Sequence, residues 1–137
     1  DFNPETAPVI SAQIMKVLAA KDVLIVWGDG EQTRSFTYVS DEVAGMMLAV
    51  EKYAKAEPLN IGTSEEIKIK DLIGLIVQLS GKKLRIEYDT SKPCGAPRRC
   101  PDISKPARLI GYQPKVRVAQ GLGETMEWYQ KHVAPAL

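Results

Sequence analysis

The chain has 137 residues, of which 45% are hydrophobic and 26% charged, and its formal net charge is +1. This length supports one hydrophobic core, and the composition is that of a folded protein rather than a disordered one. The balanced charge argues against a nucleic-acid-binding protein, and no apolar run reaches the roughly 18 residues of a membrane span. We therefore expect a cytoplasmic protein with one domain.

The first third of the chain predicts three regular elements and a turn. Apolar residues at helical spacing predict a helix over residues 9–20, and the apolar run Val23–Trp27 predicts a strand. Gly28 and Gly30 then indicate a turn. Residues 35–39 are β-branched or aromatic at most positions, which favours a second extended segment.

A second helix is expected directly after that segment. Ser40 or Asp41 can cap it by accepting hydrogen bonds from the first free N–H groups. Four apolar residues follow at spacings of three and four, which predicts a buried stripe: Val43, Met46, Met47 and Val50.

The middle of the chain alternates between the two kinds of element. Residues 59–62 are expected to form a short strand, and residues 69–79 a helix that ends at Gly81. Lys68 stands where a capping Ser or Thr would be favourable. Residues 84–88 alternate with period two, as in a strand with one exposed face.

Prolines and glycines dominate the next segment, residues 90–101, which predicts an irregular loop. Residues 104–110 are expected to form a short helix before a turn at Gly111. A last helix would bury Leu122, Met126, Tyr129 and Val133 on one face. The predicted fold is therefore α/β (α+β), a small mixed sheet with about five helices.

The cysteines and the histidine offer little material for a metal or redox site. Cys94 and Cys100 are separated by five residues, and His132 is the single histidine. This spacing fits neither a zinc site nor a Cys-x-x-Cys pair, so free thiols are favoured over a disulfide. His132 is expected to be an exposed surface residue.

Two sequence patterns typical of dehydrogenases fail in this chain. The turn at Gly28 and Gly30 lacks the third glycine of a dinucleotide-binding loop, because position 33 is a threonine. Tyr88 and Lys92 match Tyr-x-x-x-Lys, but the tyrosine ends a predicted strand and a proline follows the lysine. We therefore expect no catalytic residue and no cofactor-binding loop here.

Arginines in two loops remain as candidate ligand-binding residues. Arg34 follows the glycine turn, and Arg98 and Arg99 lie in the proline-rich loop. A guanidinium group is a permanently charged, planar partner for phosphate. The alternative is that these arginines are solubilising surface charges.

The order of several segments resembles one enzyme family. These segments are VWGDGEQTRSFTYVSDEVAGMMLAVEK, PLNIGT, IKDLIGLIVQLSG, YDTSKPCGAPRRCPDISKPARLIGYQP and GLGETMEWY. They resemble the carboxyl-terminal portion of the NAD-dependent epimerase/dehydratase family, the extended short-chain dehydrogenases that act on nucleotide sugars. The proline-rich loop is most similar to GDP-fucose synthases, and Arg99-Cys-Pro-Asp102 is also similar to UDP-glucuronate decarboxylases.

The resemblance implies that residues 1–137 form a single nucleotide-sugar-binding domain. The amino-terminal NAD-binding Rossmann half, with the glycine-rich loop and the catalytic Tyr-x-x-x-Lys helix, is absent and would precede Asp1. By this resemblance Arg34, Arg98 and Arg99 would hold the diphosphate of the substrate, and Trp27 would lie against it. NAD(P) is implied for the intact enzyme, and the chain alone would be inactive.

Two other readings of the sequence remain. The chain can be a stand-alone binding or interaction module that self-associates, because surfaces normally buried against a Rossmann half need a cover. Nucleic-acid binding through Arg98 and Arg99 is the weakest reading. The expected partners are thus a nucleotide-sugar substrate together with either a homo-oligomer or the missing Rossmann half.

Overall fold

A computed structural model describes residues 1–3, 5–93 and 95–134 of the chain. The residues gather into two compact units. Unit 1 comprises Asp1–Gln32, Lys68–Pro97 and the chain from Thr125 onward, and unit 2 comprises Thr33–Ile67 and Arg98–Glu124. The predicted α/β class is confirmed, with five helices among the described residues and two small sheets in place of one.

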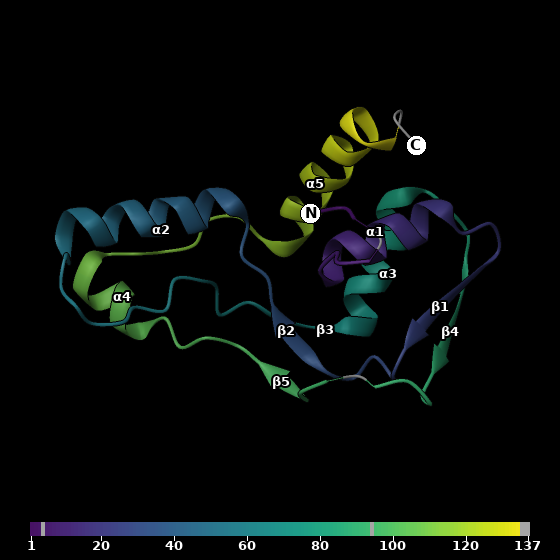
Figure 1. Cartoon of the computed structure of the whole chain (residues 1–137), viewed down its shortest axis with the longest axis horizontal. Coiled ribbons are helices and arrows are strands. Elements are labelled where there is room, and N and C mark those ends of the chain that lie inside the picture. Colours follow the sequence, from purple (N-terminus) through teal and green to yellow (C-terminus); the bar gives the residue numbers. More distant parts are fainter. Residues whose placement is uncertain (4, 94, 135–137) are drawn as a thin grey trace. The chain divides into compact units, whose positions relative to one another are not determined.

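Unit 1 is built from two helices and two parallel strands (Figure 1). Helix α1 (Val9–Ala19) packs against helix α3 (Ile69–Ser80). Strand β1 (Val23–Trp27) pairs in parallel with β4 (Arg85–Asp89). Along β1 exposed and buried residues alternate, so one face of the strand pair contributes to the core. The predictions for all four elements are confirmed.

The glycine turn caps helix α3. Lys68 at the N-cap makes no side-chain capping bond. Instead the N–H of Ile69 donates to the Gln32 carbonyl at 3.0 Å, and the N–H of Lys70 donates to the Gly30 carbonyl at 2.9 Å. Gly30 has φ of 73°, a left-handed conformation that favours glycine. Backbone carbonyls thus satisfy helix N–H groups that a Ser or Thr side chain often satisfies.

Glu31 in the same turn makes the stability of unit 1 depend on pH. A hydrogen bond from Lys68 has the largest effect on the pKa of Glu31, and one from Lys70 the next largest. Together they hold this pKa at about 2, below its ordinary value of 4.5. A carboxyl group with a depressed pKa contributes stability that is complete above its ordinary pKa and is lost as the pH falls through the lowered one. We therefore expect stability to decrease between about pH 4.5 and 2.

Thermal melting of the chain and of Glu31→Gln across this pH range measures that contribution. The variant should lose part of the pH dependence, since its amide does not titrate. An identical pH dependence in both proteins would contradict the assignment.

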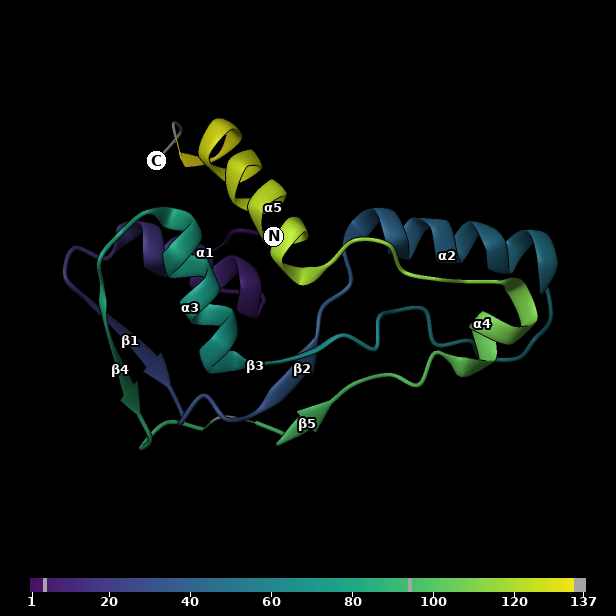
Figure 2. The same ribbon diagram turned by 180° about the vertical axis from the view of Figure 1, so that it is seen from behind.

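Unit 2 contains a three-stranded sheet and two helices (Figure 2). Its strands have the order β3 (Glu66–Lys68), β2 (Thr33–Ser35) and β5 (Arg98–Arg99), and β2 and β5 are parallel. Helix α2 (Val39–Lys52) lies beside helix α4 (Ser104–Ile110). Helix α5 (Val118–His132) begins in unit 2 and ends in unit 1.

Tyr112 lies at the centre of the unit 2 core. Its side chain is 1% exposed, and its hydroxyl donates to the Gly62 carbonyl at 2.8 Å. Gly45 of α2 lies directly against the ring. Next to it Asp41 is 6% exposed, and its carboxylate accepts the backbone N–H groups of Lys115 and Val116.

The start of α2 differs from the sequence prediction. The helix begins at Val39 with Tyr38 at the N-cap, and no side chain caps it. Asp41 does not cap the helix because its carboxylate binds the chain at Lys115 instead. The local capping preference is thus overridden by a contact between distant segments.

Three predictions about strands are wrong. The strand expected over residues 35–39 lies at Thr33–Ser35, and residues 59–62 form no strand. The loop over residues 90–101 contains strand β5, which is only two residues long. Such short strands depend on a partner in space, which periodicity in the sequence does not reveal.

The predicted buried stripe of α2 is wrong as well. Its four side chains are exposed: Val43 by 52%, Met46 by 53%, Met47 by 56% and Val50 by 71%. The buried side of the helix is instead the one that carries Asp41 and Gly45. Helical periodicity shows which residues share a face, and it does not show what covers that face.

The remaining helices follow the predictions. Gly81 and Gly111 end α3 and α4 in the left-handed conformation. In α5 three predicted core residues are buried, while Val133 lies beyond the helix end and is half-buried. No helix in the described part of the chain has both the length and the apolar character that a bilayer crossing needs.

Candidate anion-binding site

The register of strands β2 and β5 sorts three basic residues onto two faces. Thr33 lies opposite Arg98, and Arg34 lies opposite Arg99. Successive side chains of a strand point to opposite faces of the sheet. Arg34 and Arg99 therefore share one face, and Arg98 lies on the other.

Arg98 is held by an acidic residue on its own face. Its Nε and Nη2 atoms donate to the carboxylate of Glu66 at 2.9 and 2.8 Å. The Thr33 hydroxyl donates to the same carboxylate, so one group links all three strands. The hydrogen bond from Arg98, followed in size by that from Thr33, lowers the pKa of Glu66. The same hydrogen bond to Glu66 raises the pKa of Arg98.

Arg34 and Arg99 lack such a carboxylate. Arg34 is half-buried, and its Nη1 donates to the Thr33 carbonyl at 2.6 Å. Arg99 is exposed, and neither arginine forms an ion pair within the described residues. Like charges directly opposite one another in a sheet destabilise it. An anion bound on this face would remove that repulsion.

Trp27 in unit 1 has basic residues around it. It ends β1, and its side chain is 54% exposed. The ammonium groups of Lys16 and Lys92 lie 5.4 and 6.0 Å from the centre of its ring, within the range of cation–π contacts. The sequence analysis placed neither lysine beside Trp27, since Lys92 is distant in sequence and no motif links Lys16 to the end of this strand.

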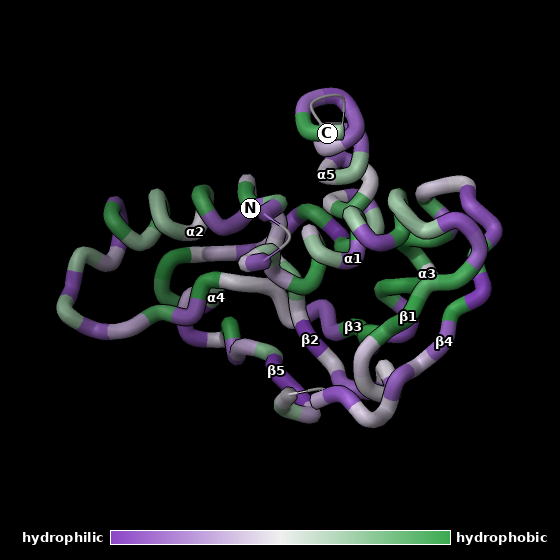
Figure 3. Tube along the Cα trace, turned by 45° about the vertical axis from the view of Figure 1, so that its right-hand side comes forward, coloured by the Kyte–Doolittle hydropathy of each residue, from purple (hydrophilic) through white to green (hydrophobic). Residues whose placement is uncertain are grey.

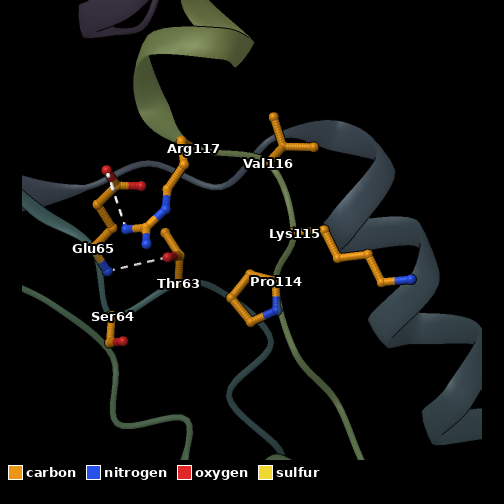
Figure 4. Close-up of a pocket in the computed structure, with 7 residues that line it drawn as sticks. All are labelled: Thr63, Ser64, Glu65, Pro114, Lys115, Val116 and Arg117. Carbon is orange, nitrogen blue, oxygen red and sulfur yellow. Dashed lines mark hydrogen bonds and ion pairs between the residues drawn. The ribbon is translucent and has the colours of Figure 1, made fainter.

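A polar pocket in unit 2 offers a second candidate (Figure 4). It has a volume of about 350 Å³, and its lining residues include Thr63, Glu65, Lys115 and Arg117. Arg117 points toward Glu65 at 3.8 Å, and Lys115 points away from them. The Glu65 carboxylate also accepts the N–H of Val118 at the start of α5. This arginine is therefore part of a helix-capping arrangement, and the pair on β2 and β5 is the better anion site.

Other residues considered in the sequence provide no catalytic site. Tyr88 lies in strand β4 and Lys92 in the turn after it, so they do not share a helix face. His132 is exposed and stacks on Trp128. Within the described residues no three His, Cys, Asp or Glu side chains form a group that could hold a metal ion.

Of the two cysteines, only Cys100 lies among the residues that the structure describes. Cys100 forms no disulfide within the described residues and is half-buried, with its Sγ atom 4.0 Å from the Ser64 carbonyl oxygen. A disulfide would require Cys94, which lies outside the described residues. The preference for free thiols stays a prediction.

Comparison with solved structures defines the class of the fold. The structure of UDP-glucuronic acid 4-epimerase from Bacillus cereus, in complex with UDP-glucuronic acid and NAD, matches with a TM-score of 0.80 and 31% identity. The match covers 94% of this chain and 41% of the epimerase. UDP-glucose 4-epimerase from Thermotoga maritima matches with a TM-score of 0.84 and 29% identity, over 95% of this chain and 42% of that one. The fold is that of a portion of an NAD-dependent epimerase or dehydratase.

The chain belongs to the family described as GDP-mannose 4,6 dehydratase, whose sequence model matches residues 3–125. Putative GDP-L-fucose synthase 2 from Arabidopsis thaliana is 36% identical over 97% of this chain and 42% of its own length. A dTDP-4-dehydro-6-deoxy-D-allose reductase from Streptomyces is also 36% identical, over 96% of this chain and 39% of its own length. The chain thus spans about two fifths of the length of these relatives.

Proposed function

We propose that this chain is the substrate-binding portion of an NAD(P)-dependent nucleotide-sugar epimerase, dehydratase or reductase. Arg34 and Arg99 bind the diphosphate of the nucleotide sugar. The observation that carries this proposal is their pairing on one face of β2 and β5 without a carboxylate partner among the described residues. The substrates named for its relatives carry GDP, dTDP or UDP, so a diphosphate is common to all of them.

The chemistry of the two arginines suits this ligand. A nucleoside diphosphate sugar has two adjacent anionic phosphates, and a guanidinium group can donate two parallel hydrogen bonds to phosphate oxygens. Each charge-assisted hydrogen bond contributes about 1.5 to 3 kcal/mol. Arg98 contributes less directly, since Glu66 already occupies its guanidinium group. Trp27 remains a proposed ligand contact, with its exposed ring and adjacent lysines.

The glycine turn before α3 does not fit the pyrophosphate of a nicotinamide dinucleotide. Such a cofactor needs free N–H groups at the start of a helix after a glycine turn. Here the carbonyls of Gly30 and Gln32 occupy the N–H groups of α3. We therefore assign no cofactor to this chain, propose that it is inactive alone, and keep the cytoplasmic location as part of the proposal.

Calorimetric titration with GDP, UDP and dTDP sugars tests the proposal. We expect binding of at least one of them, weakened by about 10-fold or more in Arg34→Ala and in Arg99→Ala, because each variant loses a charge-assisted contact of at least 1.5 kcal/mol. The folding stability of Arg99→Ala should not decrease, because the substitution removes a like-charge repulsion, whereas Arg34→Ala also loses the hydrogen bond to the Thr33 carbonyl.

Arg98→Ala is the matched control within the same strand. It should affect binding less than Arg99→Ala does, and it should lower stability through the loss of the Glu66 contact. Equal effects of Arg98→Ala and Arg99→Ala on affinity would contradict the assignment of the two faces. The absence of binding at millimolar ligand would contradict the proposed function itself.

A further inference from the structure

The sheet that carries the proposed diphosphate site also contains a carboxylate. Glu66 lies on β3, which pairs with β2, and β2 pairs with β5. Its side chain is 26% exposed, and its carboxylate accepts hydrogen bonds from Nε and Nη2 of Arg98 and from the Thr33 hydroxyl. A negative charge near an anion site lowers its affinity for every anion. Glu66 therefore affects the ligand as well as the stability of the sheet.

The three strands have two positive charges without a partner. Lys68 and Arg98 each form an ion pair with a carboxylate. Arg34 and Arg99 share one face of the sheet and form no ion pair within the described residues. The strongly hydrophilic colour of β5 in Figure 3 reflects its two adjacent arginines. If residue 66 were neutral, Arg98 would add a third unpaired positive charge to this sheet.

Nucleotides with a diphosphate differ in the number of their negative charges. In a nucleotide sugar each phosphate is bonded on two sides and has one ionised oxygen, so the diphosphate carries two charges. A free nucleoside diphosphate ends in a phosphate whose second pKa is about 6, which gives it nearly three charges near neutral pH. A nucleoside triphosphate has nearly four. The two unpaired arginines thus match the charge of the nucleotide sugar.

We propose that Glu66 is a specificity-determining residue of this site, which favours nucleotide sugars over free nucleoside di- and triphosphates by limiting the positive charge of the sheet. Glu66 acts through its charge and meets Arg98 on the face opposite to Arg34 and Arg99. The penalty that it imposes grows with the charge of the ligand, so it is largest for the triphosphate. This inference rests on the proposed function, because it requires the diphosphate to bind at Arg34 and Arg99.

Calorimetric titration at low ionic strength, without divalent cations, tests the inference. The ligands are three sets: GDP-mannose, GDP and GTP; UDP-glucose, UDP and UTP; dTDP-glucose, dTDP and dTTP. Glu66→Gln should raise the affinity about 2-fold for each ligand charge, so the affinity ratio of triphosphate to nucleotide sugar should rise about 4-fold. The glutamine oxygen can still accept hydrogen bonds from Thr33 and Arg98, so the variant should stay folded.

Arg98→Ala tests the same inference with the opposite sign. It leaves the Glu66 charge unpaired, so the affinity ratio of triphosphate to nucleotide sugar should fall about 4-fold. The double variant Glu66→Gln/Arg98→Ala has the net charge of the parent chain and should restore the parent ratio. A purely structural role of the ion pair would not restore it, because the double variant has lost both partners.

Glu57→Gln is the matched control for the loss of a paired carboxylate. Glu57 also belongs to unit 2, where it forms an ion pair with Lys105 of α4. It follows the end of α2 that lies far from β2 and β5 in Figure 1. This variant should change the affinity ratio by less than about 1.5-fold. In about 0.5 M salt the ratios of Glu66→Gln and of the parent chain should converge, because salt screens the charge.

Two results would overturn this inference while the proposed function stands. The first is an unchanged affinity ratio in Glu66→Gln when the parent chain binds a nucleotide sugar. The second is a double variant that keeps the altered ratio of one of the single variants. If the parent chain binds none of the three nucleotide sugars, the proposed function is wrong and this inference is wrong with it.

Discussion

Replacement of Gly45 by alanine should lower the free energy of unfolding by about 3 kcal/mol, a large effect for one methyl group. A Cβ atom at this position would lie 2.4 Å from Cγ2 of Ile61 and 2.8 Å from Cε2 of Tyr112. Tyr112 is fully buried and its hydroxyl is bonded to the Gly62 carbonyl, so the ring cannot move aside without loss of that bond. Urea denaturation followed by circular dichroism measures the effect.

Gly74→Ala provides the matched control. Gly74 also lies inside a helix, α3, but a Cβ atom there would meet no other atom within 4 Å. This substitution should stabilise the protein by about 0.5 to 1 kcal/mol, because alanine has the higher helix propensity. If both glycine variants had the same stability, the contact of Gly45 with Tyr112 would not be a constraint.

The second large effect is expected for Asp41→Ala, which should destabilise the chain by about 3 kcal/mol. Asp41 is buried, and one of its carboxylate oxygens accepts the N–H groups of Lys115 and Val116 at 2.9 and 2.8 Å. Alanine leaves both N–H groups without this acceptor. The same urea denaturation experiment measures the loss.

Asp41→Asn separates charge from hydrogen bonding. Its amide oxygen can still accept both N–H groups, so it should be destabilised less than Asp41→Ala. The exposed Asp22 supplies a control, and its replacement by alanine should change stability by less than about 0.5 kcal/mol. Equal stability of Asp41→Ala and Asp22→Ala would show that the buried contact contributes nothing.

Elements with their own local signals could be predicted from the sequence. The apolar run of β1, the alternation of β4 and the glycine that ends α3 each depend on residues close together in the chain. Their positions in the structure match the predictions within one or two residues. The family resemblance, which the comparisons confirm, likewise depended on the order of several such segments.

Features set by contacts between distant segments could not be predicted in this way. The exposure of the apolar side chains of α2 depends on what covers the helix, and the two-residue strand β5 exists only through its pairing with β2. In the candidate site the arginines were found by residue type. Their division between two faces follows from the register and from Glu66, which lies more than 30 residues away from Arg98.

Because both residues of β5 are arginines, a change in the length of the loop before β5 has a limited effect on the charges of this sheet. Insertion or deletion of one residue before β5 would shift its register against β2 by one position and reverse which side chain faces which surface. After such a slip either Arg98 lies opposite Arg34 while Pro97 lies opposite Thr33, or Arg99 lies opposite Thr33 while Cys100 lies opposite Arg34. The doublet therefore keeps an arginine at one of these two positions after a slip in either direction, whereas a strand with a single arginine would lose it from both positions in one of the two directions.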